Sequence, residues 1–406
     1  DGNTETPADG DTYGYIKDTN GNPVEGVVVS DGYSCTATDA EGRYALTRNA
    51  DAGFVFYSLP SAYKVSVDKT YKLPRFFARL QAGTARYDFT LEALAAPEKR
   101  FDLICIGDPQ PAKAEEATRF EREAMVDVRR TATASAVPCY GVALGDHVNN
   151  KWTLFTNMVV ALQPEQTGVP VFATIGNHDH EFPTADEKAA RAKSESYFGP
   201  VDSSFNRGDV HVVCMDDVIY TSGTEYTNGF TDAQLAWLRA DLSFVPKQKM
   251  VILCYHIPLR SGTARNMAAV KALLSEYAEA HLMAAHTHYN ENFINTDADG
   301  GLYEHIHGAH RLALQIQPAR RVVPDPSASR RRHPQRLHLS LYAEDGDRQR
   351  LERRSRMAGY ALRERRGDQG DDAGDDLHRR VVGGVPCGRA GARRQLQVAL
   401  QAHVRG

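Results

Sequence analysis

The chain of 406 residues lacks the features that would place it at once in several common protein classes. No apolar run approaches the roughly 20 residues that a membrane helix needs, so the sequence predicts no transmembrane segment. None of the six cysteines forms a CxxC pair, which argues against a zinc ribbon or a disulfide framework. The formal net charge is only −4, so there is no electrostatic case for binding nucleic acid or a membrane surface.

The start of the chain is also unusual, because it begins at Asp1 and has neither an initiating Met nor an apolar signal segment. Residues 1–12 are polar and acidic, and we expect them to form a flexible tether. With the β-rich region that follows, this start favours an exported protein, periplasmic or at the cell surface, whose leader has been trimmed.

Residues 13–95 alternate short apolar runs with turn-forming sequences. Turn signals such as those at 18–23, 30–32 and 39–42 recur at a spacing that predicts a small antiparallel β-sandwich. No His, Cys or paired carboxylates cluster in this region, so a packing or spacer role is favoured over ligand binding. Residues 93–100 are expected to form a linker to the next domain.

Residues 100–309 change character, because apolar strand-like runs now alternate with helical stretches. This alternation predicts a layered α/β domain. Strands are predicted over Phe101–Ile106, Val137–Leu144, Val171–Ile175, Val210–Met215, Met250–Tyr255 and Ala280–Ala284. Helices are predicted over Ala112–Thr131, Lys151–Leu162, Thr231–Leu242 and Ala264–Ala280. Thr231 and Gln234 have the spacing of a capping box at the start of one of these helices.

Five polar signals directly follow apolar runs in this domain, where open α/β sheets place their ligands. Each one alone is weak, because a single His after a strand is more often a satisfied polar residue than a ligand. Together they offer carboxylate, amide and imidazole groups at five strand ends. The signals are Asp108-Pro109-Gln110, Gly145-Asp146-His147-Val148-Asn149, Gly176-Asn177-His178-Asp179, His256, and His286-Thr287-His288.

This mixture of ligand types points to a pair of divalent transition-metal ions. Two ions about 3.5–4 Å apart need a bridging ligand, and a carboxylate serves best, which makes Asp146 the candidate bridge. Mixed oxygen and imidazole ligands suit Mn, Fe, Zn or Co better than Ca. The short His286-Thr287-His288 spacing lets two imidazoles reach different ions from one loop. Gly145 and Gly176 permit the tight backbone that leaves each strand.

The order of these five signals resembles that of the calcineurin-like metallophosphoesterase superfamily, and the β-rich front region resembles the exported bacterial members. The resemblance covers Phe101 to Ala309. It implies a layered α/β fold, a metallophosphoesterase-type β-sandwich flanked by helices, with a small N-terminal all-β domain. It also implies two ligand sets that share one carboxylate. Asp108, Gln110, Asp146 and His288 would hold one ion, and Asp146, Asn177, His256 and His286 the other.

The resemblance further implies a role for two residues that bind no metal. His178 would face the phosphoryl group as a catalytic residue, and Asp179 would orient it. Two positions depart from the commonest pattern: Gln110 stands where His is frequent, and Ala285 where Gly is usual. An amide oxygen is a weaker donor than imidazole, so the first ion would bind less tightly. Neighbouring residues could contact substrate or only pack the loops; they are His147, Asn149, Asn150, Tyr255, Tyr289 and Asn290.

The function implied is hydrolysis of a phosphoester by a metal-bridging hydroxide, with no covalent enzyme intermediate. A phosphoester substrate is expected as a partner and nucleic acid is not, while the sequence leaves the oligomeric state open. The main alternative is a non-catalytic surface or binding protein on the same fold. Loss of Asp146 or His178 would favour that alternative, but both residues are present. The sequence does not separate a phosphatase from a phosphodiesterase.

The composition breaks at residue 310. Residues 310–406 hold 21 Arg, no Lys and two aromatics, whereas residues 1–309 hold 15 Arg, 12 Lys and 33 aromatics. An Arg-rich nucleic-acid tail is one interpretation, but such tails usually contain Lys too. We favour a frameshifted or disordered tail, because Arg332–Leu337 can be encoded so that a one-nucleotide shift reads Gly-Thr-Pro-Asn-Gly-Tyr. Relatives, by resemblance, carry that segment after the His-Gly-Ala of residues 307–309.

Overall fold

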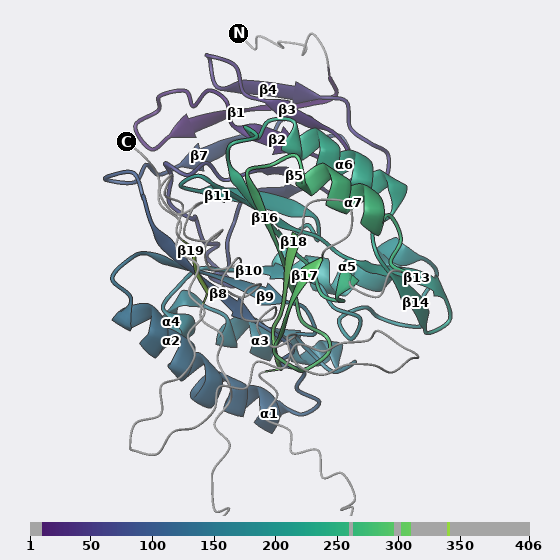
Figure 1. Cartoon of the computed structure of the whole chain (residues 1–406). Helices are drawn as coiled ribbons and strands as arrows, with labels where there is room; N and C mark the ends of the chain where they lie inside the picture. Colours follow the sequence, from purple (N-terminus) through teal and green to yellow (C-terminus); the bar gives the residue numbers. More distant parts are fainter. Residues whose placement is uncertain (1–9, 260–262, 296–301, 310–338, 342–406) are drawn as a thin grey trace, which may run out of the picture.

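A computed structural model describes residues 10–259, 263–295, 302–309 and 339–341 of the chain (Figure 1). These residues form two small front sheets, two larger sheets and a two-stranded hairpin, with helices around the larger sheets. The predicted fold class is confirmed: the protein is a mixed α/β structure with several sheets and an N-terminal all-β region.

The front region consists of two sheets, with strand orders β4-β1-β7 and β3-β2-β5-β6. In β1 the side chains alternate between buried and less buried positions, as expected for a strand with one face on a core. Turns at glycines with positive φ, such as Gly32 and Gly42, separate the strands. The strands are β1 (Thr12–Asp18), β2 (Val28–Ser30), β3 (Cys35–Ala37), β4 (Arg43–Leu46), β5 (Phe54–Tyr57), β6 (Phe77–Arg79) and β7 (Phe89–Leu91).

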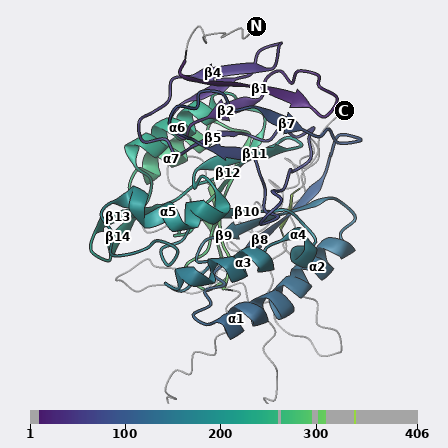
Figure 2. The same ribbon diagram turned by 180° about the vertical axis from the view of Figure 1, so that it is seen from behind.

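The first large sheet has the order β10-β9-β8-β19, with β8, β9 and β10 parallel and β19 antiparallel. Its strands are β8 (Phe101–Ile106), β9 (Cys139–Leu144), β10 (Val171–Thr174) and β19 (Leu339–Leu341). Helices cover its outer side (Figures 1 and 2). They are α1 (Ala114–Arg119), η1 (Phe120–Ala124), α2 (Met125–Ala134), η2 (Trp152–Leu154), α3 (Phe155–Ala161) and α4 (Pro164–Thr167).

The second large sheet has the order β11-β12-β15-β16-β18-β17, parallel in its centre and antiparallel at both edges. Its strands are β11 (Ser203–Arg207), β12 (Val210–Cys214), β15 (Met250–Cys254), β16 (Glu279–Ala284), β17 (Glu291–Asn295) and β18 (Leu302–Ile306). The remaining elements are α5 (Glu187–Phe198), α6 (Asp232–Leu242), α7 (Met267–Leu274) and the hairpin β13 (Val218–Ser222) and β14 (Glu225–Asn228).

Two helix predictions had different outcomes. The capping box is confirmed: Thr231 Oγ1 accepts from the Gln234 backbone N–H, and the Gln234 side chain accepts from the Thr231 N–H. The helix predicted over Ala264–Ala280 is shorter, because α7 ends at Leu274 and β16 already begins at Glu279. Ala, Leu, Lys and Glu favour helix throughout that stretch, so local propensity gave no stop signal.

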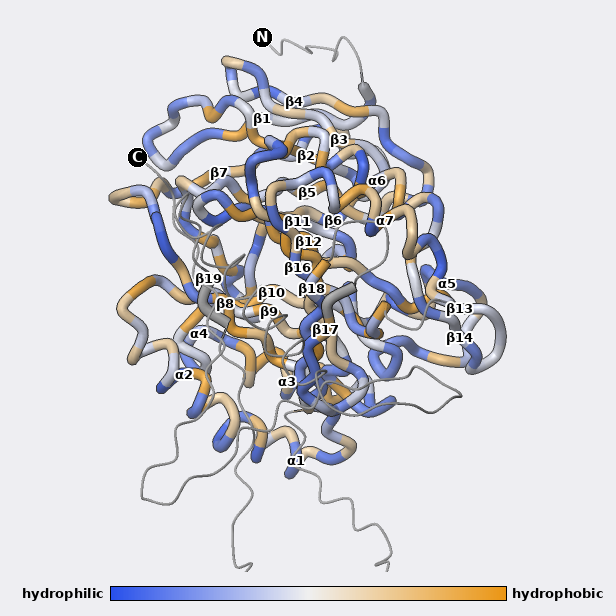
Figure 3. Tube along the Cα trace, in the orientation of Figure 1, coloured by the Kyte–Doolittle hydropathy of each residue, from blue (hydrophilic) through white to orange (hydrophobic). Residues whose placement is uncertain are grey.

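One continuous apolar core joins the front sheets to the second large sheet. Phe205 of β11 stacks on Phe172 of β10 with ring centroids 3.9 Å apart, and Phe76 packs against Phe172 at 5.8 Å. Trp237 of α6 is fully buried, and its Nε1–H donates to Ser30 Oγ of β2 over 3.0 Å. Figure 3 shows the apolar segments gathered inside, along β8, β9, β11 and β12. The front region is thus packed into the protein.

Replacing Trp237 with Ala is expected to destabilise the whole chain by about 3–5 kcal/mol, because a buried aromatic loses its contacts and leaves a cavity. Since the front sheets share this core, we expect one cooperative unfolding transition, shifted to lower denaturant concentration. Phe244→Ala is the matched control, because Phe244 is 43% exposed and its removal should change the free energy of unfolding little. Separate transitions for the two regions would contradict the shared core.

Most of the predicted tail, residues 310–406, lies outside the described residues. The exception is β19, which pairs with β8 at the edge of the first large sheet. The frameshift hypothesis and the proposed domain boundaries therefore stay predictions. Within the described part of the chain, no helix is both long and apolar enough to cross a membrane.

Candidate metal centre

The predicted metal ligands lie directly after strands of both large sheets. Asp108 and Gln110 follow β8, Asp146 follows β9, and Asn177 follows β10. From the other sheet, His256 follows β15, and the pair of histidines at 286 and 288 follows β16. The contacts described below bring the carboxyl ends of the two sheets together around one point.

The backbone at these positions is unusual. Among the described residues, eight non-glycine residues have a positive φ, and five of them are predicted ligands. A non-glycine residue with a positive φ costs conformational energy, and such residues concentrate at functional sites. Asp and His tolerate positive φ better than most residues, which suits the ligand types found here. The five are Asp108 (φ 45°), Gln110 (φ 39°), Asp146 (φ 52°), His286 (φ 62°) and His288 (φ 63°).

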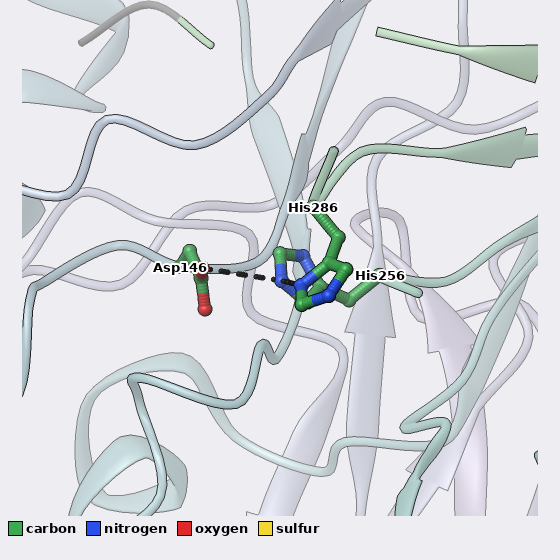
Figure 4. Close-up of side chains that lie close together, drawn as sticks. All are labelled: Asp146, His256 and His286. Carbon is green, nitrogen blue, oxygen red and sulfur yellow. Dashed lines mark hydrogen bonds and ion pairs between the residues drawn. The ribbon is translucent and has the colours of Figure 1, made fainter. Parts of the chain in front are cut away.

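One group of possible ligands consists of Asp146, His256 and His286 (Figure 4). His256 Nε2 lies 3.2 Å from Asp146 Oδ2 and 3.3 Å from His286 Nδ1. The other ring nitrogen, His256 Nδ1, lies 2.7 Å from the carbonyl oxygen of Leu144. A proton on Nδ1 would donate to that carbonyl and leave the Nε2 lone pair facing Asp146 and His286, which is the tautomer a metal ligand needs.

A second group consists of Asp108, Asp146 and His288, so Asp146 belongs to both. His288 Nε2 lies 3.5 Å from Asp108 Oδ1. Both oxygens of Asp108 also accept from the backbone N–H of His286, at 3.2 and 3.0 Å. The structure thus brings together two ligand groups that overlap in one buried carboxylate.

The charges of this site stabilise one another. Burial alone would lower the pKa of His256, but Asp146 and Asp108 raise it to about 10. Burial alone would raise the pKa of Asp146, but the charge and hydrogen bond of His256 hold it below its usual range. Burial raises the pKa of Asp108, whereas burial and the His256 charge lower the pKa of His286 to about 4. A cation is therefore favoured between the carboxylates and the imidazoles, and a divalent ion can take the place of the His256 proton.

Two glycines allow the ligand loops to approach closely. A Cβ on Gly176 would lie 2.3 Å from the backbone nitrogen of Asp146, and a Cβ on Gly145 would lie 2.7 Å from the backbone nitrogen of Gly176. Any side chain at either position would push the Asp146 loop away from the Asn177 loop. The sequence predicted that these glycines let the backbone leave each strand tightly. The structure adds that they also let the two ligand loops touch.

Two amide side chains test whether the site fits a metal. Asn177 Oδ1 is buried and has no hydrogen-bond donor within the described part of the chain, which is costly unless a ligand occupies it. Gln110 differs, because its Nε2 donates to Asp146 Oδ2. To bind an ion, Gln110 would have to present its oxygen instead. The orphaned amide oxygen, carboxylates and imidazoles together fit a divalent transition metal.

The predicted pairing of His178 with Asp179 is not what the structure shows. Both Asp179 oxygens are engaged elsewhere: Oδ2 lies 2.9 Å from His147 Nδ1 and accepts from Gly176 N–H, and Oδ1 accepts from Val148 N–H. Asp179 therefore joins the Asp146 loop to the Asn177 loop and orients His147. His178 is held through its backbone, whose N–H donates to Asp146 Oδ1 over 2.9 Å.

The other neighbours of the ligands differ in their exposure. His147 and Tyr255 are fully buried, and the Tyr255 hydroxyl donates to Glu304 Oε1 over 2.6 Å, so both support the fold. Asn290 Oδ1 accepts from the Gly308 N–H. Tyr289 is 70% exposed, so its side chain is accessible from solvent.

Sequence reasoning missed Asp217. This fully buried carboxylate accepts from the backbone N–H groups of His256 and Ile257 and fixes the loop that carries His256. Burial raises its pKa to about 7. A signal was present, because Asp216-Asp217 follows the apolar run of β12 just as the five recognised signals follow theirs.

Comparison with protein families agrees with this geometry. A model described as calcineurin-like phosphoesterase matches residues 90–290, and one described as the N terminal of calcineurin-like phosphoesterase matches residues 11–94. The chain belongs to the calcineurin-like phosphoesterase family. The predicted superfamily, with its N-terminal module, is confirmed. Among curated proteins, no match was found. With the Asp and His groups described above, membership of the calcineurin-like phosphoesterase family supports a metal-dependent hydrolase acting on phosphoesters.

Proposed function

We propose that the protein hydrolyses phosphoester bonds at a dinuclear metal centre. The observation that carries this proposal is the overlap of the two ligand groups in Asp146, because a pair of ions needs a bridging ligand and a carboxylate serves best. Asp108, Gln110, Asp146 and His288 are assigned to one ion, and Asp146, Asn177, His256 and His286 to the other. The ions, when bound, lower the pKa of a coordinated water so that hydroxide is available as the nucleophile.

The remaining roles belong to side chains of the chain itself. His178 is half-buried beside Asp146, and we assign it to the phosphoryl oxygens or the leaving group, where a protonated imidazole stabilises negative charge. Asp179, whose carboxylate contacts His147 and two backbone N–H groups, positions the two ligand loops rather than His178. Exposed Tyr289, which follows the ligand His288 in the chain, is assigned to contact with the substrate.

The proposal is tested with a set of model phosphoesters. We expect the full chain loaded with Mn to hydrolyse at least one aryl phosphate monoester or diester, to lose this activity on chelation, and to regain it when Mn is restored. The ratio of the two rates would decide between phosphatase and phosphodiesterase. Chain that holds metal but hydrolyses neither class would favour the alternative of a non-catalytic binding protein.

A further inference from the structure

A second cluster of metal-binding side chains lies beside the candidate metal centre and shares no residue with it. His180, Glu187 and Asp216 bring their ligand atoms within 4.8 Å of one another. His180 Nε2 is 3.2 Å from Asp216 Oδ2 and 4.0 Å from Glu187 Oε1. His180 and Asp216 are buried, whereas the Glu187 side chain is one-third exposed. These separations are close to those between ligands of a single small metal ion, whose bonds are about 2.0–2.2 Å.

Each of the three side chains is held by a backbone partner on the atom that faces away from the cluster. His180 Nδ1 lies 2.9 Å from the carbonyl oxygen of Gly176. Asp216 Oδ1 accepts from the Val218 N–H over 2.9 Å, and Glu187 Oε2 accepts from the Tyr220 N–H over 2.7 Å. A proton on His180 Nδ1 leaves the Nε2 lone pair directed at the two free carboxylate oxygens. Metal ligands are typically oriented by such outer partners.

The surrounding charges leave room for a divalent cation. Arg191 is one cation of this region, and its Nε lies 3.1 Å from Glu195 Oε1. Its charge also acts on Glu187, and Glu195 has Arg79 and Lys188 as further cationic neighbours. The Arg191 charge also lowers the pKa of buried Asp202, although burial still raises that pKa to about 6. Four carboxylates, those of Glu187, Glu195, Asp202 and Asp216, thus share the charge of Arg191, while Arg79 and Lys188 act on Glu195. A divalent ion bound by Glu187 and Asp216 would offset the negative charge on their side of this group.

Without metal, protons supply this balance. Burial alone would lower the pKa of His180, but Asp216 raises it to about 9. Burial, with repulsion from Asp216, raises the pKa of Glu187 to about 7. The ordinary explanation of the cluster is therefore a protonated His180 paired with Asp216, and the experiment below separates the two explanations.

The cluster also has a route to solvent. Glu187 lines a cavity of about 350 Å³ between the front sheets, α5 and the start of α6. Phe54 and Phe56 of the front region form part of its wall, together with Asp202, which precedes β11, and Val218 of the hairpin strand β13. An ion could enter through this cavity without passing through the Asp146 centre.

We propose that His180, Glu187 and Asp216 form a separate site for one divalent transition-metal ion. One imidazole and two carboxylates suit Zn, Mn or Co, with water completing the coordination. His180 is hydrogen-bonded to Gly176, which directly precedes Asn177 and His178. The ion therefore braces the loop that carries these two residues, and its role is structural.

The test counts metal ions in the full chain. After loading with Mn and removal of free metal, we expect the Glu187→Gln/Asp216→Asn variant to hold one ion fewer than the wild type, with an affinity loss at this site of at least about 100-fold. The same difference of one ion is expected between Asp146→Asn chains with and without these two changes. Glu195→Gln is the matched control, because it removes a neighbouring carboxylate of α5 that pairs with Arg191, and it should lose no ion.

An equal metal content in the wild type and the double variant would overturn the proposal, as would loss of an ion in Glu195→Gln. If circular dichroism shows that the double variant does not fold, His180→Gln takes its place, because the Gln amide can still donate to Gly176. That variant should lose the same ion, and its retention of the ion would be equally contrary. Since the readout is metal content, the outcome does not depend on whether the chain hydrolyses phosphoesters.

Discussion

Replacing Asp146 with Asn should release the ions of the candidate metal centre and abolish hydrolysis. Asp146 is the one residue common to both ligand groups, and an amide has one oxygen and no charge with which to bridge two cations. We expect the rate to fall by more than the roughly 10²–10³-fold that follows loss of one transition-state donor. Asp146→Ala should give the same loss. The measurements are metal content and initial rate with a model phosphoester.

Asn is the sharper substitution at this position for two structural reasons. It tolerates the positive φ of residue 146, and its side-chain oxygen can still accept from the His178 N–H. Asp39→Asn provides a matched control, because Asp39 is an exposed turn residue whose carboxylate accepts only backbone N–H groups among its described contacts. Full metal content and activity in Asp146→Asn would refute the bridging role.

Replacing His178 with Ala should lower kcat by about 10²–10⁴-fold while leaving the metal content unchanged. The side chain belongs to neither ligand group, and it is the His178 backbone that contacts Asp146. That contact survives in the Ala variant. An interaction made only in the transition state lowers kcat and kcat/KM together, so KM should change little.

The comparison that decides this assignment is between His178→Ala and Asp146→Asn under the same loading conditions. If both variants release metal equally, His178 is a ligand or a support for ligands, and its catalytic role is wrong. Asp179→Asn adds a further distinction. Because Asp179 contacts His147 and two backbone N–H groups, its loss should weaken metal binding through loop movement.

The candidate site was accessible from the sequence because each ligand follows an apolar strand. Buried parallel strands read as continuous apolar runs, so the polar residue that ends each run marks a sheet edge. Asp146 and His256 could be located in this way, although they are far apart along the chain. Their convergence further required the two sheets to pack together, and no sequence pattern reports the distance between two sheets.

Pairings between side chains were less predictable. Asp179 has His178 and His180 as sequence neighbours, yet its carboxylate meets His147 from another loop. Local order could not rank these partners, because the contact with His147 depends on how two loops from different strands pack together. The composition of the segment expected to be a linker, residues 93–100, likewise does not reveal its contacts. Glu98 in that segment accepts a hydrogen bond from the Tyr140 hydroxyl at 2.7 Å.

On the proposed metal assignment, the five ligand positions with positive φ would link the protein's thermal stability to the supply of metal ions. Each such residue costs roughly 1 kcal/mol relative to an ordinary backbone conformation, so the metal-free fold carries several kcal/mol of conformational strain. Ions that bind only the folded chain offset this cost, by about 2.7 kcal/mol for one site at a free concentration 100 times its Kd. The melting temperature of the chain should therefore rise with the concentration of free metal. In a compartment poor in metal, the protein would unfold and be degraded more easily.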